Sequence, residues 1–494
     1  MPPDNAPALK SRGWVRLLIA FVVAFDVAAF FLWADGAFQS EFGGHPDEAQ
    51  HYLAGVRTRD AIIHARDRAD TGFGNPAAAT HGRASAFPRL LGAWMAVFGT
   101  SRIAALLFMA MLAAATATLI FRAVRRELGD WAAPVATVVW LCAPAVRESY
   151  GTLLPEQFGA FVMTAALLLW ARLMDGGSLR RTAVPKWIGT VAVLGGGGVL
   201  GFALAVAFKL APGDSHAASH FLKECVSVPG IAVAAFALAG AVVRPRSESR
   251  AGTVWIAMTA LVAGVLFARW LKAGAPDVRL LIVATPALAM LATRGAVSLG
   301  RIVTAQKAGA DGVPSRREAL WLFLLPLLAL PPDLLSRWQK DWHGFGPVAL
   351  TLLDEARSGT RVLVVSDARG EGMLLSEIAM HDREGKITIE RGSETLADSA
   401  GTSARGRPLE RFLDDEQLFG HLTSGRIRYI VLDTAVPQDV RAGYHDQVQR
   451  VLEGNVRSFW PICDSPIIRD GEPQGHPVRI FRVVPSGETH LQLQ

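Results

Sequence analysis

Several features of soluble, secreted or metal-binding proteins are scarce in this sequence of 494 residues. Of its three cysteines, Cys142 and Cys225 lie in apolar runs and Cys463 stands alone, so no disulfide framework or metal-ligand cluster can be assembled from them. Charged residues make up only 19% of the chain, against 51% hydrophobic residues. This composition is too apolar for an ordinary soluble protein, and we expect much of the chain to lie in lipid.

Motifs for binding nucleic acids or nucleotides are also missing. The net charge of +6 is not accompanied by a basic helix with interleaved aromatic residues, so no nucleic-acid partner is expected. The glycines at Gly370 and Gly372 are too few for a loop that cradles nucleotide phosphates. The positive charge therefore needs another explanation, which membrane topology supplies.

Long apolar runs are what the sequence has instead. About 20 residues are needed to cross about 30 Å of hydrocarbon as a helix. Pro144 and Pro286 interrupt the third and eighth runs, which packed membrane helices tolerate. The sequence predicts about nine spans, at residues 14–33, 103–120, 128–146, 158–173, 187–207, 226–243, 254–270, 278–293 and 320–335.

Lysine and arginine residues are concentrated in every second loop. Short loops rich in these residues stay on the cytoplasmic side of the membrane. The pattern therefore predicts a cytoplasmic N-terminus and an exported C-terminus after nine spans. A cleaved signal peptide is the alternative for the first run, which is long and aromatic-rich for that role. The basic loops contain Lys10, Arg12 and Arg16, then Arg122, Arg125 and Arg126, then Arg180, Arg181 and Lys186, then Arg244, Arg246 and Arg250, and finally Arg294, Arg301, Lys307, Arg316 and Arg317.

This topology predicts two domains. Residues 1–337 would form a mainly α, polytopic transmembrane domain with a large first exported loop at residues 35–102, and residues 338–494 an extracytoplasmic α/β domain. Residues 393–407, rich in Ser, Gly, Thr and Ala, predict a surface loop. The tail has four segments typical of strands, at residues 361–367, 386–390, 427–433 and 478–484.

The first predicted exported loop contains an acidic pair, Asp47 and Glu48, directly after Pro46. A proline followed by acids is a favourable helix start, which is a purely structural interpretation. The functional interpretation is that Asp47, held at the lipid–water boundary, takes a proton from an acceptor hydroxyl. A metal site on His45, Glu48 and His51 is less favoured, because the two histidines point to different faces of a helix.

Further along the chain, Arg83 and Arg89 flank the start of an apolar segment, and Glu156 follows Pro155 before the fourth span. The order and spacing of these residues after Asp47 and Glu48 resemble those of the GT-C fold glycosyltransferases, over about the first 175 residues. Within that fold the resemblance is to family 39-like enzymes: the protein O-mannosyltransferases and the aminoarabinose transferases of lipid A. Glu156 also has a structural interpretation, as an acid at a helix N-terminus.

A later segment, residues 276–288, resembles the Arg-Tyr-Leu-x-Pro-x-x-Pro-Ala-Leu segment of the same enzymes. Here Leu280 replaces the tyrosine, Phe87-Pro88-Arg89 is a reduced form of the family's Lys-Pro-Pro element, and Glu156 stands where aspartate is commoner. In this resemblance Arg279 would face the donor phosphate. Arg279 and Lys223 are the best candidates for binding a phosphate group, and either Arg83 or Arg89 would fill the family's basic position.

The resemblance implies a glycosyltransferase that moves a sugar from a polyprenyl-phosphate donor to an envelope glycan, lipid or protein. Asp47 would be the general base, with Glu48 or Glu156 positioning the acceptor or sharing that role. No cofactor is implied, and a divalent metal is compatible but not required. The expected location is a bacterial-type inner membrane, with the C-terminal domain periplasmic or extracellular.

Two other classes stay open. A transporter of a lipid-linked precursor would also have apolar helices. It would be expected to have repeat symmetry and several ionisable groups at mid-membrane. Asp26 is the one ionisable residue near the middle of a predicted span. A non-catalytic assembly or sensor protein with a degenerate transferase core fits the departures from the family pattern. Bound lipid phosphate without turnover would favour it.

Overall fold

The computed structural model describes residues 6–63, 86–175, 236–237, 282–303, 340–402 and 408–484. The chain divides into two compact units. We call residues 1–33 with 107–338 the helical unit, and residues 34–106 with 339–494 the α/β unit. The segment predicted as the first exported loop therefore folds together with the C-terminal tail.

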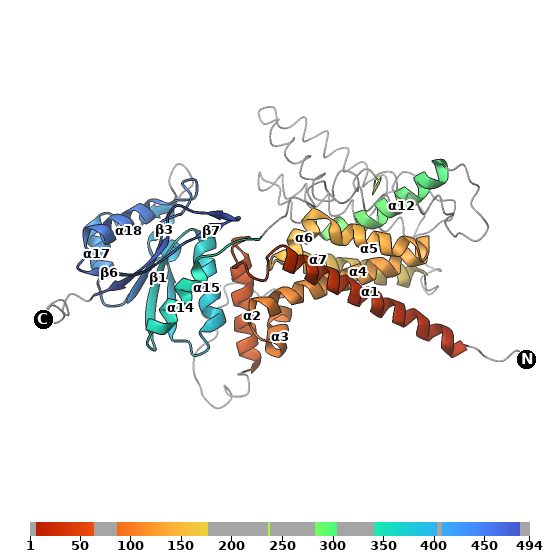
Figure 1. The fold of residues 1–494 in the computed structure, drawn as a ribbon, viewed down its shortest axis with the longest axis horizontal. Coiled ribbons are helices and arrows are strands. Elements are labelled where there is room, and N and C mark those ends of the chain that lie inside the picture. Colours follow the sequence, from red (N-terminus) through yellow and green to blue (C-terminus); the bar gives the residue numbers. More distant parts are fainter. Residues whose placement is uncertain are drawn as a thin grey trace, which may run out of the picture. The chain divides into compact units, whose positions relative to one another are not determined.

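Apolar helices make up the described part of the helical unit (Figure 1). Three helical segments of the described residues are long and apolar enough to cross a membrane, at residues 13–34, 102–128 and 282–299. The helices are α1 (Ala6–Ala34), α4 (Arg102–Leu128), α5 (Ala132–Cys142), α6 (Pro144–Gly151), α7 (Glu156–Asp175) and α12 (Thr285–Val303).

The predicted number of nine spans is not confirmed. The described residues contain three spanning helices, or four if the bent pair α6 and α7 forms one span. The predicted spans at residues 187–207, 226–243, 254–270 and 320–335 lie wholly or almost wholly outside the described residues.

The two prolines in the predicted third and eighth runs both lie at helix starts, but only Pro144 follows a break between two helices. At Ala143 the backbone is extended, with φ −60° and ψ 130°, so α5 ends at Cys142 and α6 begins at Pro144. Proline lacks a donor N–H and disfavours a helical residue before it, which separates the two helices. Pro286, in contrast, lies in the first turn of α12, where proline fits without loss of a hydrogen bond.

Polar contacts join the helices of the helical unit. The Arg16 and Arg125 guanidinium groups lie 3.0 and 2.6 Å from the Asp130 carboxylate, which ties the start of α1 to the end of α4. Arg294 of α12 lies 3.6 Å from Glu127 of α4. Each of these arginines belongs to a cluster for which the charge pattern predicts the cytoplasmic side.

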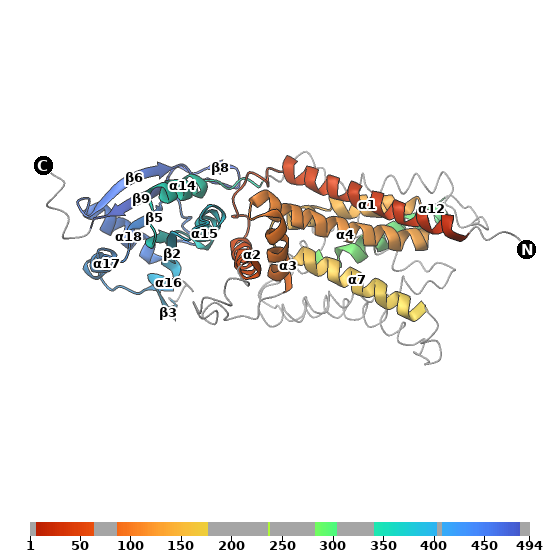
Figure 2. The ribbon, with the colours of Figure 1, turned by 90° about the horizontal axis from the view of Figure 1, so that it is seen from below.

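A five-stranded sheet in the order β2-β1-β5-β9-β6 forms the centre of the α/β unit (Figure 2). Strand β1 pairs in parallel with β2 and β5, whereas β9 pairs antiparallel with β5 and β6. The strands are β1 (Thr360–Val365), β2 (Ile387–Arg391), β5 (Tyr429–Asp433), β6 (Phe459–Ser465) and β9 (Val478–Val483).

Helices cover both faces of this sheet, because alternate residues of a strand point to opposite sides. Val362 and Val364 of β1 pack on the face covered by α14 (Phe345–Glu355) and α15 (Ala368–His381). Their neighbours Leu363 and Val365 pack on the other face, under α17 (Asp415–Leu422) and α18 (Gly443–Gly454). The four strands predicted in the tail are all present.

Two parts of the tail differ from the prediction. Strand β6 was not predicted, because Pro461 interrupts its pattern; an edge strand accommodates a proline. The segment predicted as a surface loop contains the short helix α16 (Gly392–Thr395) and strand β3 (Ala397–Thr402), which pairs antiparallel with β4 (Pro408–Glu410). Cross-strand pairing outweighs the loop-like composition here. A second small hairpin joins β7 (Ile468–Arg469) to β8 (Glu472–Pro473).

The N-terminal part of the α/β unit contributes two helices, α2 (Glu48–Ile63) and α3 (Ala86–Phe98). They pack closely, since a Cβ added at Gly92 would lie 2.5 Å from Thr58 Cβ and 2.7 Å from the Gly55 carbonyl oxygen. Helix α2 also contacts α15, where a Cβ added at Gly372 would lie 2.8 Å from the Ala49 Cβ. Helix α2 is therefore held by α15 near its start and by α3 farther along.

Candidate functional site

The acidic pair lies at the N-terminus of α2, and its two carboxylates face different surroundings. The Asp47 side chain is 48% exposed. Its backbone N–H donates to Nδ1 of His45 at 3.1 Å, and its carboxylate lies 3.6 Å from the same nitrogen. Asp47 thus presents a carboxylate to solvent at a helix start.

Glu48, one residue later, is fully buried and forms an ion pair with Lys340, whose side chain is 1% exposed. The Lys340 ammonium also lies 5.3 Å from the centre of the Phe42 ring. Burial lowers the pKa of Lys340, and the adjacent Glu48 carboxylate opposes this shift. The Glu48–Lys340 pair joins the first turn of α2 to the start of the C-terminal tail.

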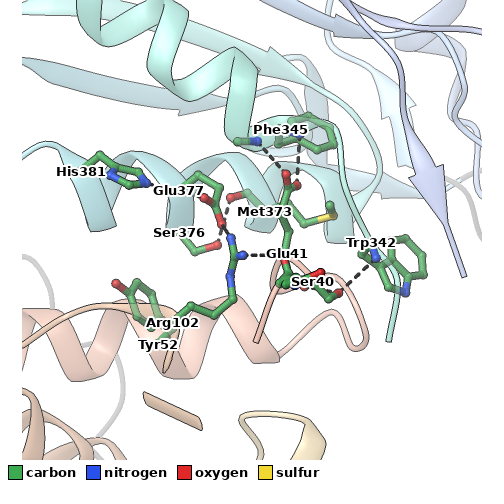
Figure 3. Close-up of polar contacts among 12 residues, drawn as sticks. Ser40, Glu41, Tyr52, Arg102, Trp342, Phe345, Met373, Ser376, Glu377 and His381 are labelled. Carbon is green, nitrogen blue, oxygen red and sulfur yellow. Dashed lines mark hydrogen bonds and ion pairs between the residues drawn. The ribbon is translucent and has the colours of Figure 1, made fainter. Parts of the chain in front are cut away.

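A third carboxylate, Glu41, is buried at the N-terminus of α14 (Figure 3). It accepts hydrogen bonds from the backbone N–H groups of Gly344, Phe345 and Gly346, at 3.1, 3.1 and 2.7 Å. These are donors that an α-helix leaves without partners in its first turn. Burial and the nearby Glu377 carboxylate raise the pKa of Glu41 to about 7, and the three N–H groups oppose this rise.

Arg102 links the same region to α15. Its guanidinium donates to the buried Glu377 carboxylate and, at 2.6 Å, to the Gln39 carbonyl (Figure 3). The buried Tyr52 hydroxyl donates to the Thr100 carbonyl at 2.6 Å, and desolvation raises its pKa. Together with the preceding contacts, these bonds form a polar network that connects α2, α14 and α15.

Sequence reasoning missed the roles of Glu41, Lys340 and Glu377. Their contacts join residues about 300 positions apart in the sequence. Examples are the contacts of Lys340 with Glu48 and of Phe345 with Glu41. One signal in the sequence could have indicated Glu41 and Lys340, which are ionisable residues just after apolar runs, on the side predicted to be exported. Glu377 lies inside the C-terminal tail, in α15, and has no such signal. Pairing between them required the fold.

The remaining predicted site residues are placed as follows. Arg89 is exposed on α3. Glu156 lies in the helical unit, in the first turn of α7, after a break at which α6 and α7 are bent by 115°. Arg83, Lys223 and Arg279 lie outside the described residues.

No group of three or more His, Cys, Asp or Glu residues within the described ranges could hold a metal ion. The sequence also offered His45, Glu48 and His51 as a less favoured metal site. Glu48 is paired with Lys340, and the His51 ring lies edge-on to the Phe87 ring, with 5.6 Å between the ring centres. The structure therefore does not bring His45, Glu48 and His51 together as ligands.

A second polar cluster lies where strands β1 and β5 end. Ser366 donates to the buried Asp433 carboxylate at 2.6 Å, and Arg469 binds both Asp433 and Asp367. Burial raises the pKa of Asp433, and the Arg469 guanidinium opposes that rise. Through these contacts the cluster fastens the β7–β8 hairpin to the sheet.

Comparison with known proteins identifies little. No family model matches the chain, and no curated protein matches its sequence. Among solved structures, the chain is similar to the arabinofuranosyltransferase AftD from Mycobacteria, with 16% identity and a TM-score of 0.40. The match covers 94% of this chain and 40% of that one. A likeness of this degree establishes neither the fold nor the activity.

Proposed function

We propose that this chain is a membrane glycosyltransferase in which Asp47 is the general base. The observation that supports the proposal is the different exposure of the two acids. Glu48 is buried against Lys340, while Asp47, one residue earlier, is about half exposed. A base must reach its substrate, and a carboxylate held by a rigid frame can be positioned for proton transfer.

The organisation of the α/β unit supports a location on one side of the membrane. Residues 34–106 and 339–494 share buried contacts, including Glu48 with Lys340 and Arg102 with Glu377. In this proposal both segments lie on the same side of the bilayer, and the chain between them crosses it an even number of times. This parity agrees with the eight predicted spans that follow the first loop, and the basic loops favour the exported side.

The donor in this proposal is a sugar linked to a polyprenyl phosphate, because nucleotide sugars are made in the cytosol. Asp47 takes the proton of an acceptor hydroxyl while the oxygen of that hydroxyl attacks the anomeric carbon of the donor sugar. The bond from that carbon to the lipid phosphate breaks, and the configuration inverts. The phosphate leaves as an anion, stabilised by cations for which Arg279, Lys223, Arg83 and Arg89 are the candidates.

The two other acids have supporting roles. Glu48 acts through its ion pair, which fixes the first turn of α2 and hence the direction of Asp47. Glu156, in the first turn of α7, positions the acceptor. The acceptor is an envelope glycan, lipid or protein, and the proposal includes no cofactor.

Transfer of radiolabel tests this proposal. The purified chain in vesicles is given a labelled polyprenyl-phosphate sugar and an envelope fraction as acceptor. Asp47→Asn should lower transfer by about 10²- to 10⁴-fold, the usual contribution of a general base. The matched control is Asp60→Asn, on the same helix, where the carboxylate is partly exposed beside Arg59.

Full transfer by Asp47→Asn would exclude Asp47 as the base. If the unmodified chain bound the labelled lipid but never turned it over, the chain would instead belong to the non-catalytic assembly or sensor class.

A further inference from the structure

Helix α3 carries apolar side chains on two opposite faces. One face is buried against α2 and contains Phe87, Leu91 and Met95. The other contains Ala86, Leu90, Ala93 and Val97, all of which are exposed. These four residues are spaced by four, three and four positions, which places them in one line along a helix.

This line, which we call the α3 stripe, consists of apolar residues only. Val97 is 75% exposed and Leu90 is 45% exposed. Phe98 beside it is 57% exposed, and its ring centre lies 3.9 Å from that of Trp94. A water-facing helix of a folded unit would normally carry polar residues on this side, so the stripe calls for an apolar surrounding.

The chain itself indicates what that surrounding is. Helix α3 ends at Phe98, and α4, which is long and apolar enough to cross a membrane, begins at Arg102. Four residues extend at most about 14 Å, so the end of α3 cannot lie far from the bilayer. The Trp94 indole also donates at 2.7 Å to the carbonyl of Ala104, in the first turn of α4.

Helix α3 is too short to cross the bilayer. Its 13 residues extend about 20 Å, whereas the hydrocarbon is about 30 Å thick. We propose that α3 lies in the plane of the membrane surface, with the α3 stripe among the upper acyl chains and the exposed Arg89 at the level of the lipid phosphates. Tryptophan, phenylalanine and arginine are residues that favour this boundary.

The packing of α3 on α2 gives this contact a consequence for the site. Gly55 and Gly92 allow the two helices to approach so closely that a side chain at Gly92 would collide with Thr58. The lipid surface that holds α3 thereby also sets the depth of α2, and hence of Asp47 at its start. The membrane contact does not depend on the transferase proposal.

Nitroxide labels test the proposal on the full chain. Cys142, Cys225 and Cys463 are replaced by alanine or serine, and single cysteines are introduced by Val97→Cys or Ala93→Cys. Vesicles contain zwitterionic and anionic phospholipids. The measurement is the collision rate of each label with oxygen, which concentrates in lipid, and with a water-soluble nickel chelate. The control is Leu413→Cys, a 90% exposed apolar position in the C-terminal part of the same unit.

We expect the ratio of oxygen to nickel collisions to be several-fold higher at Val97 and Ala93 than at Leu413. Nickel collisions as frequent at Val97 as at Leu413 would place the stripe in water and overturn the proposal. Protection from both reagents, with dipolar broadening between labels, would assign the stripe to a second copy of the chain and overturn it equally. Absence of transfer by the unmodified chain, together with the expected collision ratios, would count against the transferase proposal alone.

Discussion

Replacing Glu48 by glutamine removes one charge from the buried pair that joins α2 to the C-terminal tail. Glutamine has nearly the same shape, so the change leaves the Lys340 ammonium in place without its counter-charge. Both side chains are essentially inaccessible to water, at 0% and 1% exposed. Removing one partner of such a pair costs about 3–5 kcal/mol. At about 1.4 kcal/mol for each factor of ten, the local opening equilibrium should rise about 10²- to 10⁴-fold.

Hydrogen exchange of the α2 amides in the full chain, in detergent or vesicles, measures this opening. Lys340→Met should have a similar effect, because it removes the ammonium group that faces the buried Glu48 carboxylate. The double variant Glu48→Gln with Lys340→Met should recover most of the loss, since neither buried charge is left. Asp60→Asn is the control: its partner Arg59 is partly exposed, so the change should be worth no more than about 1 kcal/mol.

The pH dependence gives a second check on the same variant. In Glu48→Gln the pKa of Lys340 should fall further, because burial is no longer opposed by the carboxylate. The unfolded chain then binds more protons than the folded chain, so the stability of the variant should rise with pH. Two results would refute this prediction. One is an α2 amide exchange rate in Glu48→Gln equal to that of the unmodified chain at pH 7. The other is a loss of stability in Glu48→Gln that grows between pH 7 and 9.

Two further predictions concern the same unit. The pKa of Glu41 is about 7 in the folded chain and 4.5 ordinarily, so the folded chain binds more protons between these values. The free energy of unfolding should fall by on the order of 3 kcal/mol as pH rises through this window. Glu41→Gln should remove this pH dependence in denaturant titrations at pH 5 and 7.5. An unchanged pH dependence in the variant would contradict the assignment. Gly92→Ala should destabilise the α2–α3 contact by about 1–3 kcal/mol in hydrogen exchange, because the added methyl group would overlap Thr58. Gly420→Ala, in helix α17 with no atom within 4 Å, should instead be neutral or stabilise by up to about 1 kcal/mol, and equal effects of the two changes would contradict the packing argument.

Local patterns in the sequence predict much of the α/β domain. The segments that became β1, β2, β5 and β9 alternate or cluster apolar residues between polar turns, and the structure contains all four strands. Strand β6 could not be predicted in this way, because Pro461 is acceptable only at the edge of a sheet, and edge position is a property of the completed sheet.

The candidate site shows where local reasoning ends. Asp47 and Glu48 are adjacent, so a helix must point them in different directions, and their presence at the start of α2 follows from Pro46 and the helix dipole. Which of the two is buried depends on Lys340, nearly 300 residues later. For the same reason, the carboxylate that binds the first turn of α14 could not be identified as Glu41 before the fold was known.

The most direct test of the account is a cryo-electron microscopy structure of the chain with a polyprenyl-phosphate sugar bound. We predict sugar density with its anomeric carbon facing the Asp47 carboxylate across the space for an acceptor hydroxyl, and a lipid phosphate contacted by Arg279 or another of the proposed cations. Well-defined sugar density remote from Asp47, with the phosphate on none of those cations, would contradict the assignment of Asp47 as the base of a glycosyltransferase.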